Sequence, residues 1–196
     1  MPQDDKLVQA LLEVKEAINR LLEEKACVYI AIDGRCAAGK STLAEALQRE
    51  LGCEVAHMDD FFLRPGQRTA ERLSKPGENV EYERFLAEVL IPYRSGVEFT
   101  YRPYDCHTQT LKKPVKVFPG QVFVVEGAYS CHDSLRDFYD LHIFLDVERK
   151  VQLERIAARN GAEAARRFEE LWIPLEEAYF AAYNIKERCE LQFKLG

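Results

Sequence analysis

The sequence predicts a three-layer α/β fold in which helices cover both faces of a five-stranded, mostly parallel β-sheet. Two observations support this prediction: short, nearly continuous apolar runs recur along the chain, and segments with helical spacing of apolar residues separate them. Continuous apolar runs are typical of strands buried on both faces, and strand–helix alternation is typical of parallel sheets. Because the chain has 196 residues, we expect a single domain with one sizeable core.

Each element follows from its own pattern. The strands are the apolar runs at 27–32, 54–58, 122–125, 141–145 and 189–193. The helices have apolar residues three and four positions apart and are expected at about 5–24, 41–51, 147–159 and 162–187. Gly52 is expected to stop the second helix, and Pro174 is expected to kink the last one.

The segment from about 60 to 118 breaks this alternation. Its prolines and glycines mark loops, and a helix is expected around Phe85–Leu90. Two β-like stretches between Phe99 and Val117 flank a polar middle and are expected to pair as a hairpin. An insertion of this kind beside a sheet predicts a small subdomain that cradles a substrate.

Composition and charge exclude several classes of function. The net charge of −6 and the isoelectric point of about 5.4 argue against a nucleic-acid partner. No apolar run approaches the roughly 18 residues that span a bilayer, and the first residues lack a signal-peptide pattern. The six cysteines form no Cys-x-x-Cys pair, so we expect reduced thiols and no zinc site. These features predict a cytoplasmic protein with no membrane partner.

Residues 34–41 match the phosphate-loop motif G-x-x-x-x-G-K-[ST]. The motif follows a buried strand and opens a helix, so backbone N–H groups and the helix N-terminus can bind phosphates. Lys40 is expected to bridge the β- and γ-phosphate oxygens, and the Ser41 hydroxyl is expected to bind Mg²⁺. The expected nucleotide-binding residues are Gly34, Ala37, Ala38, Gly39, Lys40, Ser41 and Thr42.

Carboxylates at strand ends indicate which kind of phosphate-loop protein this is. The GTPase motifs D-x-x-G and N-K-x-D do not occur in the sequence. Glu126 directly follows the strand at 122–125, where a carboxylate can hold Mg²⁺ or contact an acceptor. Asp59 and Asp60 follow the strand at 54–58, where a kinase needs a general base for the acceptor hydroxyl. Asp59 is nearer to the strand and is the preferred base, with Asp60 as the alternative.

A lid over the phosphates is expected at about 150–170. Arg155 and Arg159 lie on a predicted helix, and Arg167 lies beyond a break at Gly161. Guanidinium groups stabilise the charge of a transferring phosphoryl group, and a closed lid excludes water. Arg155 and Arg159 would then be catalytic. The alternative is that these arginines are solvated and pair with glutamates on the same helices.

The phosphate loop, the MDDFF segment (58–62), the VVEGAYS segment (124–130) and the late arginine-rich helix together resemble the uridine kinase-like family of P-loop kinases. Phosphoribulokinase and bacterial pantothenate kinase are relatives in that family. The resemblance covers about residues 27–193 and implies the P-loop NTPase fold with a lid, ATP as phosphoryl donor, and Asp59 as general base. It implies a Mg²⁺ ion surrounded by Ser41, Asp59 and Glu126.

The same resemblance implies contacts with the acceptor. Residues 102–107 resemble the segment that uridine kinases place against the nucleoside base, although His107 follows Tyr104 at a shorter interval than in the family. Residues 79–81 resemble a segment whose acid meets ribose hydroxyls, with Glu81 longer by one methylene than the family's aspartate. The implied substrate-binding residues are Phe62, Glu81, Tyr104, His107, Glu126 and Arg167. The aromatic residues of the insertion can equally form its minor core.

The leading hypothesis is an ATP-dependent kinase that phosphorylates a hydroxyl of a small metabolite such as uridine or cytidine. A (deoxy)nucleoside monophosphate kinase is an alternative, in which Arg64, Arg68 and Arg72 would bind the extra phosphate; a pantothenate-like alcohol kinase is another. A nucleotide-binding regulator is a third reading, and it would have no need of a base at Asp59. ATP or GTP as donor, and monomer or homo-oligomer, stay open from the sequence alone.

Overall fold

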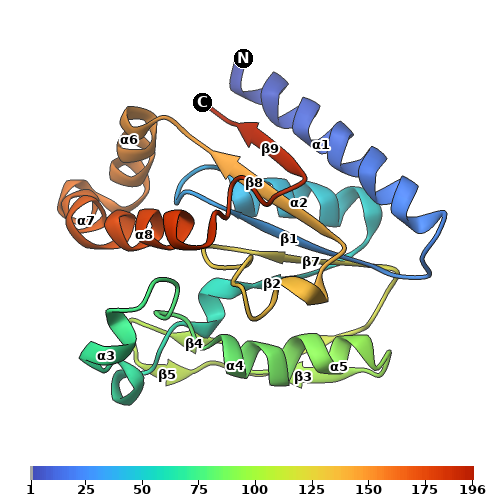
Figure 1. The fold of residues 1–196 in the computed structure, drawn as a ribbon, viewed down its shortest axis with the longest axis horizontal. Helices are drawn as coiled ribbons and strands as arrows, with labels where there is room; N and C mark the ends of the chain where they lie inside the picture. Colours follow the sequence, from blue (N-terminus) through green and yellow to red (C-terminus); the bar gives the residue numbers. More distant parts are fainter. Residues whose placement is uncertain (1) are drawn as a thin grey trace.

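The computed structural model describes residues 2–196, with side chains described from residue 5 onward, and its centre is a five-stranded parallel sheet (Figure 1). In spatial order the strands are β2 (Glu54–His57), β7 (Val122–Glu126), β1 (Val28–Gly34), β8 (Leu141–Asp146) and β9 (Leu191–Lys194). All neighbouring pairs in this order run parallel. The predicted fold class and all five predicted sheet strands are therefore confirmed.

The register brings the carboxyl ends of the central strands together. Glu126 at the end of β7 is the pairing partner of both Ile32 in β1 and His57 in β2. The three central strands are almost completely buried, as their continuous apolar runs predict. Ligands of parallel α/β sheets bind at this edge, where the polar residues that follow each strand meet.

Two helices, α1 (Pro2–Leu22) and α2 (Lys40–Leu51), cover one face of the sheet (Figure 1). Ile18 of α1 and Leu47 of α2 are fully buried in one apolar cluster with Ile30 of β1. Gly52 ends α2 in the left-handed conformation, with φ of 63°, and its N–H donates to the Gln48 carbonyl oxygen at 2.9 Å. This confirms the predicted helix stop.

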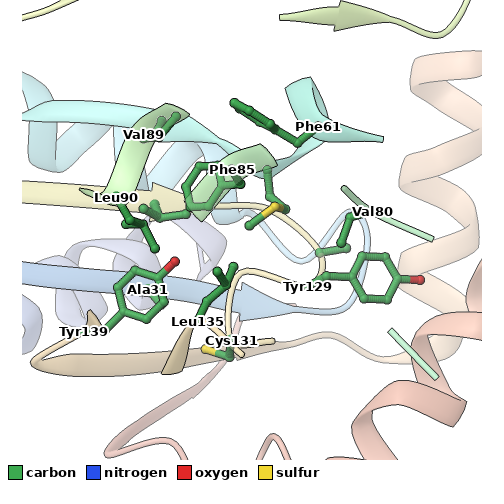
Figure 2. Close-up of a cluster of buried hydrophobic side chains, with 14 of the residues drawn as sticks. Ala31, Phe61, Val80, Phe85, Val89, Leu90, Tyr129, Cys131, Leu135 and Tyr139 are labelled. Carbon is green, nitrogen blue, oxygen red and sulfur yellow. The ribbon is translucent and has the colours of Figure 1, made fainter. Parts of the chain in front are cut away.

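The opposite face is covered largely by the inserted segment and by α8 (Ile173–Tyr183). Figure 2 shows this second core, in which Phe85, Leu90 and Tyr139 gather with Ala31 of β1. The Phe61 and Phe85 rings pack edge to face with centroids 5.0 Å apart.

The inserted segment forms short helices and two nested hairpins. Its helical parts are η1 (Met58–Phe61), η2 (Pro65–Gln67), α3 (Ala70–Leu73), α4 (Tyr82–Phe85), the π-helical turn η3 (Leu86–Leu90) and α5 (Ile91–Arg94). Its strands are β3 (Phe99–Tyr101), β4 (Tyr104–Asp105), β5 (Thr110–Leu111) and β6 (Val115–Val117). Strand β3 pairs with β6 and β4 pairs with β5, both antiparallel, so the predicted hairpin is confirmed.

The last part of the chain is helical until it returns to the sheet edge. Its elements are η4 (Arg136–Phe138), α6 (Arg149–Asn160), α7 (Ala162–Arg167), the π-helical turn η5 (Phe168–Trp172) and α8. Gly161 breaks α6 from α7 with φ of 89°. Pro174, which is expected to kink the last helix, is the second residue of α8 and comes just after the π-helical turn. The expected helix end at residue 187 is wrong, because Asn184 adopts the left-handed conformation and ends α8 at Tyr183.

Candidate active site

The phosphate loop connects β1 to α2 through a backbone that needs small residues. Gly34 has φ of 127°, and a Cβ atom on it would lie 2.1 Å from the Leu145 carbonyl oxygen of β8. Gly39 has φ of 103° and precedes α2, while Ala37 also has positive φ. The sequence motif thus produces the tight strand-to-helix turn that leaves backbone N–H groups directed toward a bound anion.

The Lys40 side chain lies along the inside of this turn. Its Nζ atom donates to the carbonyl oxygens of Gly34 at 2.7 Å and Arg35 at 3.0 Å, and the residue is 8% exposed. The next two residues, Ser41 and Thr42, are exposed at the start of α2. The ammonium group and the N-terminus of α2 therefore lie at the same edge of the sheet.

Glu126 connects the phosphate loop to the end of β2. Its two carboxylate oxygens each lie 3.2 Å from the Ser41 hydroxyl, and Oε1 lies 2.5 Å from Nδ1 of His57. The carboxylate raises the pKa of His57 by this hydrogen bond, although partial burial of the imidazole acts in the opposite direction. His57 is a residue of this site that no sequence motif marks.

Asp59 and Asp60 differ in their surroundings. The Asp60 carboxylate accepts a hydrogen bond from the Tyr101 hydroxyl at 3.3 Å, whereas among the described residues Asp59 accepts none. Asp59 is exposed at the rim, yet the protein around its carboxyl displaces enough water to raise its pKa. The nearby Glu126 carboxylate adds to this rise and Lys40 opposes it.

Gly127 allows Asp59 to approach Glu126. A Cβ atom at Gly127, where φ is 134°, would lie 3.0 Å from the Met58 Cβ atom and 3.4 Å from Oδ1 of Asp59. The Glu–Gly step at the end of β7 therefore leaves room for the Asp59 carboxylate beside the next strand end. The two carboxylates and the phosphate loop converge on one place.

The oxygen atoms at this place fit a Mg²⁺ ion. Ser41 and Glu126 are in contact, and Asp59 lies beside Gly127. Over the described part of the chain, His, Cys, Asp and Glu side chains nowhere gather in threes close enough to hold a metal by themselves. Magnesium prefers oxygen donors and commonly takes only one or two carboxylates, with water and substrate phosphates completing its shell.

Asp33, at the end of β1, forms a structural centre. It is fully buried and accepts hydrogen bonds from the N–H groups of Gly34 and Cys131 and from the Tyr179 hydroxyl, at 2.7, 2.9 and 2.9 Å. Burial raises the pKa of this carboxyl, and the hydrogen bonds and Lys40 act against the rise. Asp33 thus fixes the loop after β7 and the helix α8 against the phosphate loop.

The insertion surrounds Glu81 with hydrogen-bond donors. This carboxylate is nearly buried and accepts hydrogen bonds from Arg64 at 2.7 Å, Gln67 at 2.7 Å and Arg84 at 3.0 Å. Arg72 bonds to the Val80 carbonyl oxygen and pairs with glutamates, and Arg68 donates to the Leu63 carbonyl oxygen. The arginines that a phosphorylated acceptor would need are thus engaged within the insertion.

The structure separates the aromatic side chains of the insertion into two groups. Phe61, Phe85 and Tyr101 are buried in the second core, whereas Phe62 and Tyr82 pack against it and stay partly exposed. The first three residues therefore belong to the core of the insertion.

Two residues expected to contact the acceptor lie apart from that core. Tyr104 is 3% exposed, and its hydroxyl finds no hydrogen-bond partner among the described residues. His107 is exposed at the tip of the inner hairpin, where its N–H donates to Asp105.

The three arginines expected on a lid occupy different environments. The Arg155 guanidinium donates to the carbonyl oxygens of Ala37 in the phosphate loop and of Leu195, both at 3.0 Å. Arg159 and Arg167 are exposed, and Arg159 bonds to the neighbouring Asn160. Of these arginines, only Arg155 touches the phosphate loop in this structure.

Helix α8 adds two carboxylates that the sequence did not point to. Glu176 is 5% exposed and accepts a hydrogen bond from the Cys36 N–H of the phosphate loop at 3.0 Å. Glu177 forms an ion pair with Arg35. No local pattern marks them, because acidic residues at successive positions of a helix usually face solvent.

Comparison with known proteins agrees with this geometry. The model of the phosphoribulokinase/uridine kinase family matches residues 29–173. A uridine kinase of Shewanella piezotolerans is 30% identical over an alignment of 163 residues that covers 76% of this chain and 76% of its own. A phosphoribulokinase of Synechocystis sp. is 28% identical over 74% of this chain and 45% of its own.

Comparison with solved structures finds a similar fold. The structure of a possible uridine kinase from Bacillus stearothermophilus superposes with a TM-score of 0.68, at 19% identity, over 98% of this chain and 100% of that one. Within residues 2–196, no helix combines the length and the apolar character that crossing a bilayer requires. By its family match, its relatives and its phosphate loop, the chain is a kinase that belongs to the phosphoribulokinase and uridine kinase family.

Proposed function

We propose that this chain transfers the γ-phosphoryl group of ATP, bound with Mg²⁺, to a hydroxyl of a small metabolite, and that the acceptor is a nucleoside such as uridine or cytidine. The observation that carries the proposal is the convergence of Asp59, Glu126 and the phosphate loop at one sheet edge. Phosphoryl transfer needs positioning, charge stabilisation and a group that takes the acceptor proton, and these residues can supply all three.

Each residue has a role in this proposal. The backbone N–H groups of residues 37–42 and the Lys40 ammonium would hold the phosphates, and Ser41 with Glu126 would hold the metal. Mg²⁺, when bound, supplies positive charge against the phosphate oxygens. Asp59 would accept the proton of the attacking hydroxyl, since no donor among the described residues bonds to its carboxylate.

Arg155, Arg159 and Arg167 would stabilise the transferring group from the lid side. Arg155 already contacts the loop at Ala37, which supports its assignment most directly. Arg159 and Arg167 would need the segment around α7 to move toward the phosphates, and the break at Gly161 gives that segment a place to bend.

The nucleoside assignment rests on the family and on the insertion beside Asp59. Glu81, Phe62, Tyr104 and His107 come from this insertion, and the buried Tyr104 hydroxyl has no hydrogen-bond partner among the described residues. The monophosphate-kinase alternative is disfavoured, because Glu81 and Glu83 pair with Arg64 and Arg72. A pantothenate-like alcohol acceptor uses the same Asp59 base and remains the second candidate.

A coupled assay of ADP release tests the proposal. The protein is mixed with ATP and Mg²⁺ and with uridine, cytidine, nucleoside monophosphates, pantothenate or simple sugars. ADP release that depends on uridine or cytidine is expected. Release only with monophosphates would replace the proposal with nucleotide kinase activity, and tight ATP binding without release for any acceptor would favour a regulator.

A further inference from the structure

His57 is the last residue of β2, and its imidazole contacts a carboxylate that the proposed function places at the metal. The register of the sheet pairs His57 with Glu126 at the end of the neighbouring strand β7. Their side chains meet with Nδ1 and Oε1 2.5 Å apart. One hydrogen bond therefore joins two strand ends at the edge of the sheet where the phosphate loop lies.

The Glu126 carboxylate is held from two sides. Its side chain is 6% exposed, whereas the His57 side chain is 45% exposed. Among the described residues, Oε1 contacts both Ser41 and His57, and Oε2 contacts Ser41 alone. A buried carboxylate needs hydrogen-bond donors, and one serine hydroxyl has a single hydrogen to donate. His57 is therefore the second donor that fixes the orientation of this carboxylate.

The contact also defines the tautomer of the His57 ring. An ionised carboxylate only accepts hydrogen bonds, so Nδ1 carries the hydrogen and Nε2 is left to solvent. Mg²⁺ prefers oxygen ligands, and thus the carboxylate suits the ion better than the imidazole does. Carboxylates that bind metals are commonly oriented by a hydrogen bond from a residue behind them, and His57 has the position of such a residue.

We propose that His57 is a positioning residue for the metal: its Nδ1–H group holds Oε1 of Glu126, so that the carboxylate stays turned toward Ser41, where the ion would bind. The inference rests on the proposed function, because it concerns the ion that accompanies ATP. It is independent of the acceptor. The end of β2 then has two tasks, since Asp59 follows it as the proposed base.

Binding of Mn²⁺ to the complex of the protein with ADP tests the inference without any acceptor. Mn²⁺ is the probe because its free form gives an electron paramagnetic resonance signal. His57→Phe keeps a planar ring but has no donor, and it should weaken Mn²⁺ binding about 10- to 100-fold, the usual effect of removing a partner of a metal ligand. His57→Asn, whose amide can donate from the place of Nδ1, should restore most of this affinity. ADP affinity in EDTA should be equal in all three proteins.

His142→Phe is the matched control. His142 is the second residue of β8, near the opposite edge of the sheet, and its Nδ1 atom bonds to Glu190 at 3.1 Å. This variant therefore removes the same kind of histidine–glutamate contact away from the phosphate loop. Its affinity for Mn²⁺ should equal that of the unaltered chain.

Unchanged Mn²⁺ affinity in a folded His57→Phe protein would overturn the inference, as would an equal loss in His142→Phe or a loss in His57→Asn as large as in His57→Phe. If His57→Phe does not fold, nitrogen-15 NMR of the unaltered chain with ADP and Mg²⁺ decides. The neutral His57 ring should carry its proton on Nδ1, and a proton on Nε2 would contradict the inference.

The same titration separates this inference from the proposed function. An unaltered chain that binds no Mn²⁺ together with ADP would contradict the inference, because His57 would then have no ion to serve. A chain that shows the predicted Mn²⁺ affinities but phosphorylates no tested acceptor fails the proposed function and leaves the role of His57 standing.

Discussion

Asp59 and Asp60 are adjacent carboxylates with different partners, and this difference supports the roles proposed for them. Tyr101 donates to Asp60, whereas Asp59, beside Gly127, accepts no hydrogen bond from the part of the chain that the structure describes. A carboxylate with unoccupied lone pairs and a raised pKa is suited to accept a proton from a hydroxyl. Asp60 is better explained as a fixed contact between η1 and β3.

Asp59→Asn is therefore expected to lower the rate of transfer by about 10²- to 10⁴-fold, the usual worth of a general base. ATP binding should persist, because the phosphate loop is unchanged. Single-turnover kinetics and ATP titration measure the two effects separately. Asp60→Asn serves as the matched control and should retain most of the rate; a normal rate in Asp59→Asn would remove Asp59 as the base.

The buried Tyr104 hydroxyl is the second informative single group. A buried hydroxyl without a partner costs stability, so Tyr104→Phe should leave the free energy of unfolding unchanged or raise it. If the hydroxyl binds the acceptor, as proposed, KM for the acceptor should rise several-fold, by about 1 kcal/mol of lost binding. Chemical denaturation and steady-state kinetics measure both, and an unchanged KM would show that Tyr104 serves packing alone.

At the scale of elements, Glu81 ties the η2 region to the start of α4. Burial opposes ionisation of Glu81, but Gln67, Arg64 and Arg84 outweigh it and lower its pKa. Glu81→Gln should lower the free energy of unfolding by about 1–3 kcal/mol at neutral pH. A carboxylate whose pKa is lowered by folding stabilises the protein at pH values above its unfolded-state pKa. This stabilisation is lost as the pH falls through the pKa of the folded state. The difference in free energy of unfolding between Glu81→Gln and the unaltered chain should therefore shrink in acid.

Urea denaturation across pH measures this effect. Glu83→Gln is the control, because its ion pair with Arg72 is half-exposed and should be worth about 1 kcal/mol or less. If Glu81→Gln lowers the free energy of unfolding by the same amount at neutral and acidic pH, the charge of Glu81 is not what stabilises the insertion.

The passage from β1 into the phosphate loop depends on close approach to β8. Gly34→Ala would force a Cβ atom to within 2.1 Å of the Leu145 carbonyl oxygen. Strain and overpacking together should lower the free energy of unfolding by about 3 kcal/mol or more. Gly52 also has a positive φ, but a Cβ atom on it would meet nothing within 4 Å. Gly52→Ala should therefore lower the free energy of unfolding by only about 1 kcal/mol. Equal costs for the two variants, measured by urea denaturation, would contradict the steric explanation.

At the scale of the whole molecule, the sequence predicted those features that depend on residues close together in the chain. Continuous apolar runs identified β1, β7 and β8, and the glycine pattern of 34–39 identified the phosphate loop, because each pattern reflects physics within a few residues. The order of the strands was not predictable in this way. That β2 pairs with β7, and so brings His57 onto Glu126, depends on contacts 69 residues apart in the chain.

The same limit explains what the sequence left open in the site. Aromatic residues in the insertion suit a pocket and a small core equally well, and only the packing of Phe61 against Phe85 and Tyr101 separates the two. Glu176 looks like an ordinary helix-surface acid in the sequence. It becomes distinctive only when the fold brings α8 against Cys36, 140 residues away.

The central claim is that this chain moves a phosphoryl group from ATP to a hydroxyl, with Asp59 taking the proton. Phosphorus-31 NMR of a reaction of uridine or cytidine with ATP and Mg²⁺ tests it most directly. The unaltered chain should produce a new phosphomonoester signal together with an equal amount of ADP, and Asp59→Asn should produce neither at a comparable rate. Equal phosphomonoester from both proteins, or ADP with free phosphate and no phosphomonoester, would contradict the claim.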